Sequence, residues 1–256
     1  MSVKHPSLRI EDPADRLCVL TLDRPPANAL TSDLIEAITT TIRDLARRSE
    51  PPVVLLAAEG ERFFCAGGDI KELDGTEPEH ALRRMERFHH MLLALSAYPS
   101  AIVVAVRGYA AGGGLELALM GDVVIAGEGA KFGFPEIRNG LMPAIMGIRR
   151  AVESLGRQAA FDLLSSGRFL SAPEALALGL AQKVVPDTAV LTRATEAAME
   201  LAAKDPLILG ILKRAVQGGD AGPEAMRRRT LTEFRKILTR PAAVEARQRF
   251  LAKDRV

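Results

Sequence analysis

The chain has 256 residues, of which 48% are hydrophobic and 26% charged, a balance typical of soluble globular proteins and too polar for a membrane protein. The formal net charge is only +2, and aromatic residues make up 4% with no tryptophan, which argues against a nucleic-acid-binding surface. The only two cysteines, Cys18 and Cys65, exclude a disulfide scaffold or a thiolate zinc site.

Neither a membrane span nor a secretion signal is expected. The longest apolar stretches, residues 53–58 and 101–106, have the length of a strand and fall far short of the roughly 20 residues that a bilayer requires. The first six residues lack a hydrophobic signal core, so we expect a cytoplasmic protein. The length suits one main domain with an appended subdomain.

The first hundred residues predict alternating strands and helices. The expected elements are a strand over 17–22, a helix from Thr31 or Ser32 to about Arg48, a strand over 53–57, a loop over 59–68 and a helix from about Pro78 to Ala97. The apolar residues expected mostly on one side of that last helix are Leu82, Met85, Met91, Leu92 and Leu95.

The pattern then continues into a helical tail. The expected elements are strands over 101–106, 123–126, 131–133 and 180–185, a short helix over 115–120, and helix ends at Gly156, Gly167 and Gly179. From Thr188 onward the pattern is helical, with one apolar stripe through Val190, Leu191, Ala194, Ala197, Ala198 and Leu201. We therefore predict an α/β fold with a core over residues 1–187 and a helical C-terminal subdomain over 188–256, packed on the core or on a neighbouring subunit.

The most informative motif is a run of three glycines followed by an acidic residue. Residues 112–114 lead into a predicted helix that carries Glu116. Glycine lets backbone N–H groups approach a ligand closely, and the helix start adds the positive end of its dipole, so this place suits a developing oxyanion. Glu136, twenty residues further on, supplies a second carboxylate.

Two stretches, residues 64–72 (FCAGGDIKE) and 106–118 (VRGYAAGGGLELA), closely resemble the signatures of the enoyl-CoA hydratase (crotonase) family. The resemblance continues through residues 131–137 and 171–175, so it covers nearly the whole chain. It implies a crotonase-like spiral of β-β-α turns with a C-terminal helical subdomain, assembly as a homotrimer or hexamer, and an acyl-CoA thioester as substrate. No metal or redox cofactor is implied, because coenzyme A is part of the substrate.

The resemblance also implies an oxyanion hole. Family members hold the thioester carbonyl between two backbone N–H groups, and the matching positions here are Gly68 and Gly113. One such donor is typically worth roughly 3 kcal/mol of transition-state stabilisation. The alternative interpretation is that these glycines only form tight turns.

Glu116 and Glu136 match the two glutamates with which family hydratases place a water molecule and move its proton. Two carboxylates can share such a water, because a nearby like charge raises one pKa and lets the pair hold one proton. The matching positions assign deprotonation of the attacking water to Glu116 and protonation of the α-carbon to Glu136. The alternative is that both are ordinary exposed acids.

The CoA-binding loop of the family matches Ala66, Gly67, Gly68, Asp69, Ile70 and Lys71. Lys71 is equally well explained as a solvated side chain, and Asp69 and Asp122 are better explained by capping and structural hydrogen bonds than by catalysis. Phe250 and Lys253 resemble tail residues that reach CoA in some members, from the same or an adjacent subunit.

The chain departs from the family pattern after Glu136. Many hydratases carry a glycine-rich stretch there, whereas residues 140–147 read GLMPAIMG, with Ala144 and Met146 in place of two glycines. Ala144 keeps its N–H for binding at the site, but the acyl pocket should be tighter or differently shaped.

The residues therefore favour hydration of a 2-enoyl-CoA, and they leave alternatives open. The same oxyanion site serves enoyl-CoA isomerases, decarboxylases and thioester hydrolases in this superfamily, although isomerases often keep only one acid at the two positions. Some members bind RNA or act as noncatalytic partners, which the near-neutral charge and the complete acid pair disfavour.

Overall fold

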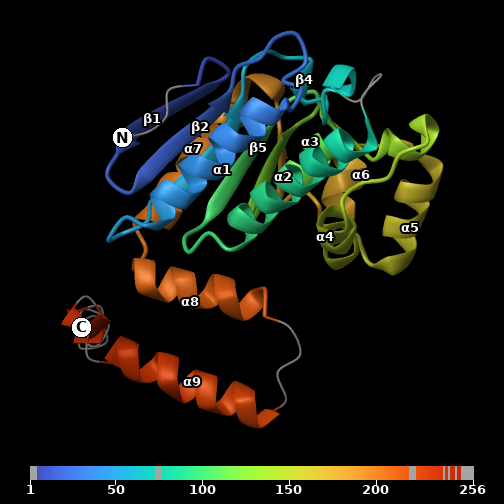
Figure 1. Ribbon diagram of the computed structural model, residues 1–256. Coiled ribbons are helices and arrows are strands. Elements are labelled where there is room, and N and C mark those ends of the chain that lie inside the picture. The colour runs from blue at the N-terminus through green and yellow to red at the C-terminus, as the bar shows by residue number, and fades with distance from the viewer. Residues whose placement is uncertain are drawn as a thin grey trace.

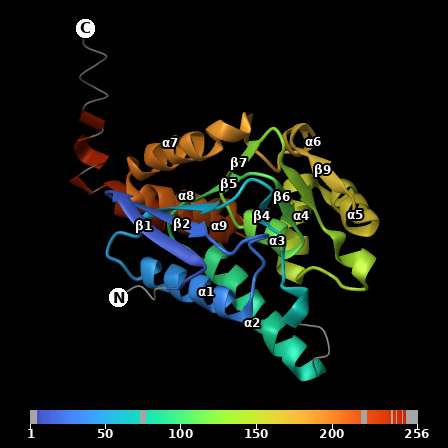
Figure 2. The same cartoon turned by 90° about the horizontal axis from the view of Figure 1, so that it is seen from above.

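The computed structural model describes residues 5–72, 77–218, 223–238, 240–241, 243–245 and 247–248. Its core holds two sheets (Figures 1 and 2). The six-stranded sheet consists, in spatial order, of β1 (Leu8–Ala14), β2 (Leu17–Leu22), β3 (Val53–Ala58), β5 (Ile102–Val106), β7 (Val123–Gly127) and β10 (Lys183–Val185). The four-stranded sheet consists of β4 (Phe63–Cys65), β6 (Tyr109–Ala111), β8 (Lys131–Gly133) and β9 (Phe169–Ser171).

The helices are α1 (Ser32–Ala46), α2 (Pro78–Ser96), α3 (Gly113–Ala118), α4 (Ile145–Leu155), α5 (Arg157–Ser166), α6 (Ala172–Ala177), α7 (Val190–Ala202), α8 (Pro206–Val216) and α9 (Pro223–Leu238). Helices α1 to α6 lie in the connections between the strands, and α7, α8 and α9 follow the last strand. Short 3-10 turns are η1 (Ile70–Glu72), η2 (Pro135–Asn139) and η3 (Asp187–Ala189). None of the helices in the described ranges is long and apolar enough to cross a membrane.

The element order produces a spiral of β-β-α turns, as the resemblance implied. Three successive turns are β3–β4–α2, β5–β6–α3 and β7–β8–α4, and in each turn the first strand joins the large sheet and the second joins the small one. Strands β2, β3, β5 and β7 pair in parallel, and so do β4, β6 and β8. The prediction of an α/β crotonase-like spiral is therefore confirmed.

The apolar runs of the central strands reflect burial on both faces of the large sheet. In β3, Val54 and Leu56 belong to the cluster that includes α1 and α2, whereas Val53 and Leu55 belong to the cluster that includes α7. Because neighbouring side chains in a strand point to opposite faces, a strand between two helical layers must be apolar at every position. Helix α7 thus covers the face of the sheet opposite α1 and α2 (Figure 1).

Two predicted apolar stripes are partly wrong. On α2 the buried positions are Arg84, Phe88, Met91, Leu92 and Leu95, spaced at the helical repeat, while Leu82 is 68% exposed and Met85 is 41% exposed. On α7, Val190, Ala194 and Ala198 are buried as expected, but Leu191 is 49% exposed. The last predicted strand is also shorter than 180–185, because β10 begins only at Lys183.

An ion pair joins the helical tail to the sheet. Lys213 of α8 lies with its Nζ 2.8 Å from Asp122 Oδ2 and donates to the carbonyl oxygen of Ser100 at 2.9 Å. The same Asp122 carboxylate accepts the N–H of Ile102 at the start of β5. Burial lowers the pKa of Lys213, and the carboxylate of Asp122 opposes that shift. Asp122 therefore has the structural role that the sequence favoured.

Replacing Asp122 with alanine should lower the free energy of unfolding by about 3 kcal/mol, because it leaves the Lys213 ammonium buried without a counter-charge. Adding Lys213→Met to that variant should recover part of the loss, since it removes the orphaned charge. Urea unfolding followed by circular dichroism measures both effects. A double variant no more stable than Asp122→Ala would show that the loss has another origin.

Candidate active site

Three segments of the candidate site follow the ends of neighbouring strands in the small sheet. Strands β4, β6 and β8 are parallel and adjacent, so their carboxyl ends lie at one edge. Gly68 follows β4, Gly113 follows β6 and Glu136 follows β8. The fold thus brings together residues that are up to 68 positions apart in the chain.

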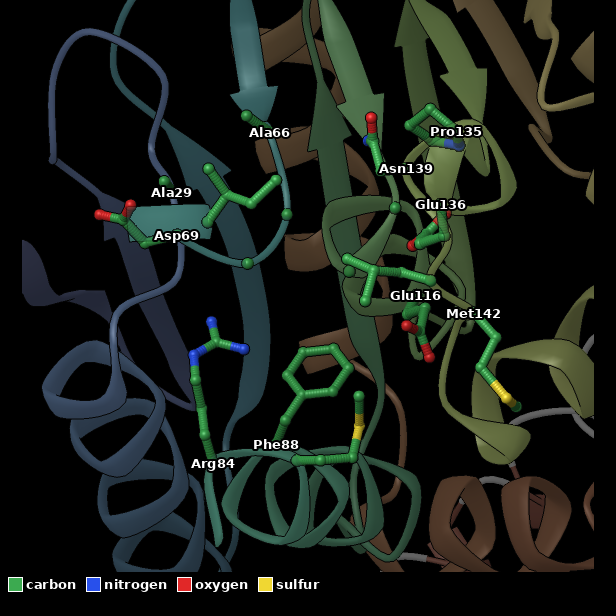
Figure 3. A pocket seen from close by; sticks show the side chains of 17 residues that line it. Ala29, Ala66, Asp69, Arg84, Phe88, Glu116, Pro135, Glu136, Asn139 and Met142 are labelled. Atoms are coloured by element: carbon green, nitrogen blue, oxygen red, sulfur yellow. The ribbon is translucent and has the colours of Figure 1, made fainter. Parts of the chain in front are cut away.

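A cavity of about 390 Å³ opens at this edge (Figure 3). Its lining residues are Ala29, Ala66, Gly67, Gly68, Asp69, Ile70, Arg84, Met85, Phe88, Gly112, Gly113, Glu116, Pro135, Glu136, Asn139, Leu141 and Met142. In Figure 3, Glu116 and Glu136 lie on one side, Asp69 and Arg84 lie on the other, and Phe88 stands between Arg84 and Glu116.

The two glycine loops touch through their backbones. Gly67 has a φ of +88°, and a Cβ there would lie 2.7 Å from the carbonyl oxygen of Ala111 and 3.0 Å from the amide nitrogen of Gly113. A Cβ on Gly114 would lie 2.1 Å from the carbonyl oxygen of Cys65. Only glycine permits this approach without moving the backbone.

Two N–H groups at this contact remain available to a ligand. Gly113 is the first residue of α3, where a helix has no internal acceptor for the N–H. Neither Gly68 nor Gly113 donates its N–H in a hydrogen bond within the described part of the chain. Both residues line the cavity, which is the arrangement expected of an oxyanion hole.

Glu116 is buried against the start of α4. Its side chain lies on α3 and the residue is 2% exposed, and its Oε1 accepts the N–H of Ala144 at 3.1 Å. A Cβ on Gly147 would lie 2.1 Å from Glu116 Oε2, so glycine at that position gives the carboxyl group its space. Burial raises the pKa of Glu116 to about 8, against a lowering effect of the Ala144 N–H, and the charge of Glu136 adds a smaller upward effect.

Glu136 reaches the same place from η2. Its carboxyl group lies against Gly112, where a Cβ would come within 2.5 Å of Oε1. Burial raises the pKa of Glu136 to about 7. One oxygen of each acid, Glu116 Oε2 and Glu136 Oε2, is buried without a hydrogen-bonding partner among the described residues. A buried carboxyl oxygen of this kind can accept a hydrogen bond from a water molecule or a ligand.

The predicted loop residues fall into two groups. Ala66, Gly67, Gly68, Asp69 and Ile70 line the cavity, whereas Lys71 is exposed on η1 and does not. Asp69 pairs with Arg24 at 2.8 Å and accepts the N–H of Lys71, so its role is structural as expected. Ala144 acts through Glu116 and is not itself in the cavity wall. Phe250 and Lys253 lie outside the described residues.

Arg84, Phe88 and Met142 are cavity residues that the sequence did not single out. The position of Arg84 could have been predicted from the helical repeat, because Arg84 occupies the same helical face as Phe88 and Met91, four and seven positions further on. A charged residue on the buried face of a helix requires a partner or a function. Met142 comes from the segment in which the chain departs from the family pattern.

Comparisons with known proteins agree with this geometry. The sequence profile of the family "Enoyl-CoA hydratase/isomerase" matches residues 13–253. The 2,3-dehydroadipyl-CoA hydratase of Escherichia coli strain K12 is 34% identical over 233 residues, which cover 91% of this chain and 89% of that protein. A probable enoyl-CoA hydratase of Bacillus subtilis strain 168 is 37% identical over 200 residues, covering 77% and 76%.

Solved structures lead to the same class. The enoyl-CoA hydratase of Bacillus anthracis superposes with a TM-score of 0.91 at 27% identity, covering 96% of each chain. Pseudomonas aeruginosa DspI superposes with a TM-score of 0.93 at 26% identity, covering 98% of this chain and 96% of that one. The fold and the family match define a protein of the crotonase class. The chain belongs to the enoyl-CoA hydratase/isomerase family.

Replacing Glu116 with glutamine should make the protein progressively more stable than the wild type as the pH rises from 5 to 8.5. The folded-state pKa of Glu116 lies above its unfolded value, so the wild type loses stability through this window and the variant does not. The difference in the free energy of unfolding between Glu116→Gln and the wild type should reach the order of 2 kcal/mol at the upper end of this pH range. Urea unfolding at several pH values measures it, with Glu128→Gln as an exposed control; a difference independent of pH would contradict the raised pKa.

Proposed function

We propose that the chain is an enoyl-CoA hydratase, which adds water syn across the double bond of a 2-enoyl-CoA and gives a 3-hydroxyacyl-CoA. The observation that carries the proposal is that the carboxyl groups of the buried Glu116 and the half-buried Glu136, each with one oxygen unpartnered among the described residues, share one cavity with two backbone N–H groups that have no partner there either. The names of the relatives support the same reaction class. Coenzyme A enters as part of the substrate, and no separate cofactor is needed.

In the proposed mechanism the N–H groups of Gly68 and Gly113 bind the thioester carbonyl oxygen. This oxygen gains negative charge when water attacks the β-carbon, because the electrons of the double bond move toward the carbonyl as an enolate. Donors already fixed at that oxygen stabilise the charge without rearranging. The position of Gly113 at the start of α3 adds the positive end of the helix dipole.

The two acids handle the protons of the added water. Glu116, as carboxylate, takes one proton while the water oxygen forms its bond to the β-carbon, and Glu136 gives its proton to the α-carbon. Both pKa values lie close to neutrality, and that of Glu116, about 8, is above that of Glu136, about 7. The one proton that the pair holds therefore favours Glu116 in the free protein, and the scheme requires it to pass to Glu136 before Glu116 acts as the base. The N–H of Ala144 faces Glu116 and favours the ionised form there.

The alternative is another crotonase-type reaction of an acyl-CoA: isomerisation, decarboxylation or thioester hydrolysis. Each would use the same oxyanion site. Hydration needs an acid and a base at one water molecule, and the paired carboxyl groups supply both. The assembly of three or six copies stays a prediction, as do the acyl group and the cellular compartment.

Replacing either Glu116 or Glu136 with glutamine should lower the rate of crotonyl-CoA hydration at least 100-fold, because general acid–base catalysis contributes about that much or more. The loss of the conjugated enoyl absorbance measures the rate. Glu128→Gln, an exposed carboxylate, is the matched control and should keep full activity. Unchanged turnover in both active-site variants would rule out the acid-pair mechanism.

The second donor can be tested with a pair of variants at Gly113. Both alanine and proline place a Cβ near the ring of Phe88, 3.1 Å from its Cζ, but only proline removes the N–H, and proline is tolerated at the first position of a helix. We expect Gly113→Pro to be at least 100-fold slower than Gly113→Ala in the same assay. Equal rates would mean that the carbonyl oxygen binds elsewhere.

A further inference from the structure

Arg84 is a buried cation behind the first oxyanion donor. It extends from α2 into the cavity wall and is 9% exposed. Its Nε donates to Glu72 Oε2 at 2.9 Å, and its Nη2 donates to the carbonyl oxygen of Leu30 at 2.6 Å. The proposed chemistry assigns it no part, yet an arginine is expensive to bury without a function or a structural need.

Glu72 holds the Arg84 side chain in one orientation. Besides Arg84, its carboxylate accepts the backbone N–H of Ser32 and the Ser32 hydroxyl, at 3.0 to 3.1 Å. Ser32 is the first residue of α1, so the carboxylate also faces the positive end of that helix. The guanidinium is therefore fixed between α1 and α2 and not free to turn toward solvent.

Leu30 connects this group to the oxyanion loop. Its carbonyl oxygen accepts the N–H of Asp69 at 3.1 Å as well as the Arg84 Nη2, and its own N–H donates to the carbonyl oxygen of Gly67 at 2.8 Å. The residues on both sides of Gly68 are thus bound to Leu30. Among the N–H groups of Gly67, Gly68 and Asp69, that of Gly68 is the one without a partner in the described part of the chain.

The guanidinium also touches Gly68 directly. A Cβ built on Gly68 would lie 2.9 Å from Arg84 Nη2, 3.1 Å from Nη1 and 3.4 Å from Cζ. The guanidinium group therefore occupies the space that a side chain on Gly68 would need. In Figure 3 the Arg84 guanidinium points toward the loop of Ala66 and Asp69.

We propose that Arg84 is a positioning residue, which holds the peptide of Gly68 so that its N–H points at the thioester oxygen. The inference rests on the proposed oxyanion hole and deepens it. Arg84 lies directly against Gly68 and binds the carbonyl oxygen of Leu30, which is itself bound to the residues on both sides of Gly68. Glu72 holds the Arg84 guanidinium in its orientation. Its planar fork serves two acceptors at once, which the single ammonium group of a lysine does not reproduce.

The test uses acetoacetyl-CoA, a thioester whose enolate absorbs at longer wavelength than its keto form. Donors at the thioester oxygen favour the enolate, with release of one α-proton to a base, so the ratio of bound enolate to keto form reports the donors without any turnover. Arg84→Met should lower this ratio, and kcat with crotonyl-CoA, about tenfold or more, while KM changes less than threefold. Arg83→Met, the exposed neighbour on the same helix, should match the wild type in all three.

Arg84→Lys separates positioning from charge. It keeps the cation and the aliphatic chain but loses the fork, so it should recover little of the enolate signal. Full recovery in Arg84→Lys overturns the inference, and so does an Arg84→Met protein that is folded by circular dichroism and keeps the wild-type enolate ratio. A wild type that gives no enolate signal overturns the oxyanion hole itself, and with it the proposed function. If Arg84→Met does not fold, the lysine variant alone decides.

Discussion

The site depends on the backbone contact between the end of β4 and the start of α3. Gly67 and Gly114 face the carbonyl oxygens of Ala111 and Cys65 at distances that no Cβ tolerates. This contact holds the two glycine loops close together, and the parallel pairing of β4 with β6 brings the ends of both strands to the same edge. A side chain at Gly67 or Gly114 would push the two loops apart and with them the N–H groups of Gly68 and Gly113. The proposed oxyanion hole therefore requires glycine at both positions.

Burial of the acids is the second constraint. The carboxyl group of Glu116 is held between α3 and the start of α4, where the N–H of Ala144 offsets part of the cost of removing it from water. The departure of residues 140–147 from the glycine-rich family pattern does not remove this donor, because a backbone N–H does not depend on the side chain. Of residues 140–147, Leu141 and Met142 line the cavity, whereas Ala144 and Met146 do not.

Much of the site was predictable from local patterns. The glycine runs, the two glutamates and the loop of residues 66–70 all reach the cavity, because their spacing from the strands fixes the edge at which they lie. Lys71, one position further, is exposed on η1 and does not line the cavity, and its contact with the substrate stays a prediction. Helix α2 was only partly predicted. Leu82 was expected on the same side as Leu92 and Leu95 but is exposed, whereas the helical repeat from Phe88 leads to Arg84. A pattern drawn from apolar residues alone leaves out a charged residue on the buried face.

The sequence by itself determined the family, the alternation of strands and helices, and which glycines and glutamates to propose as donors and acids, because these are encoded in short motifs and in the apolar periods of single elements. Only the tertiary structure decided what surrounds each of these groups. The raised pKa values of Glu116 and Glu136 come from burial by segments distant in the chain, and the support of Gly68 by Arg84 passes through Leu30 and Glu72. Desolvation and contact are properties of the packed molecule, which no local pattern of residues contains.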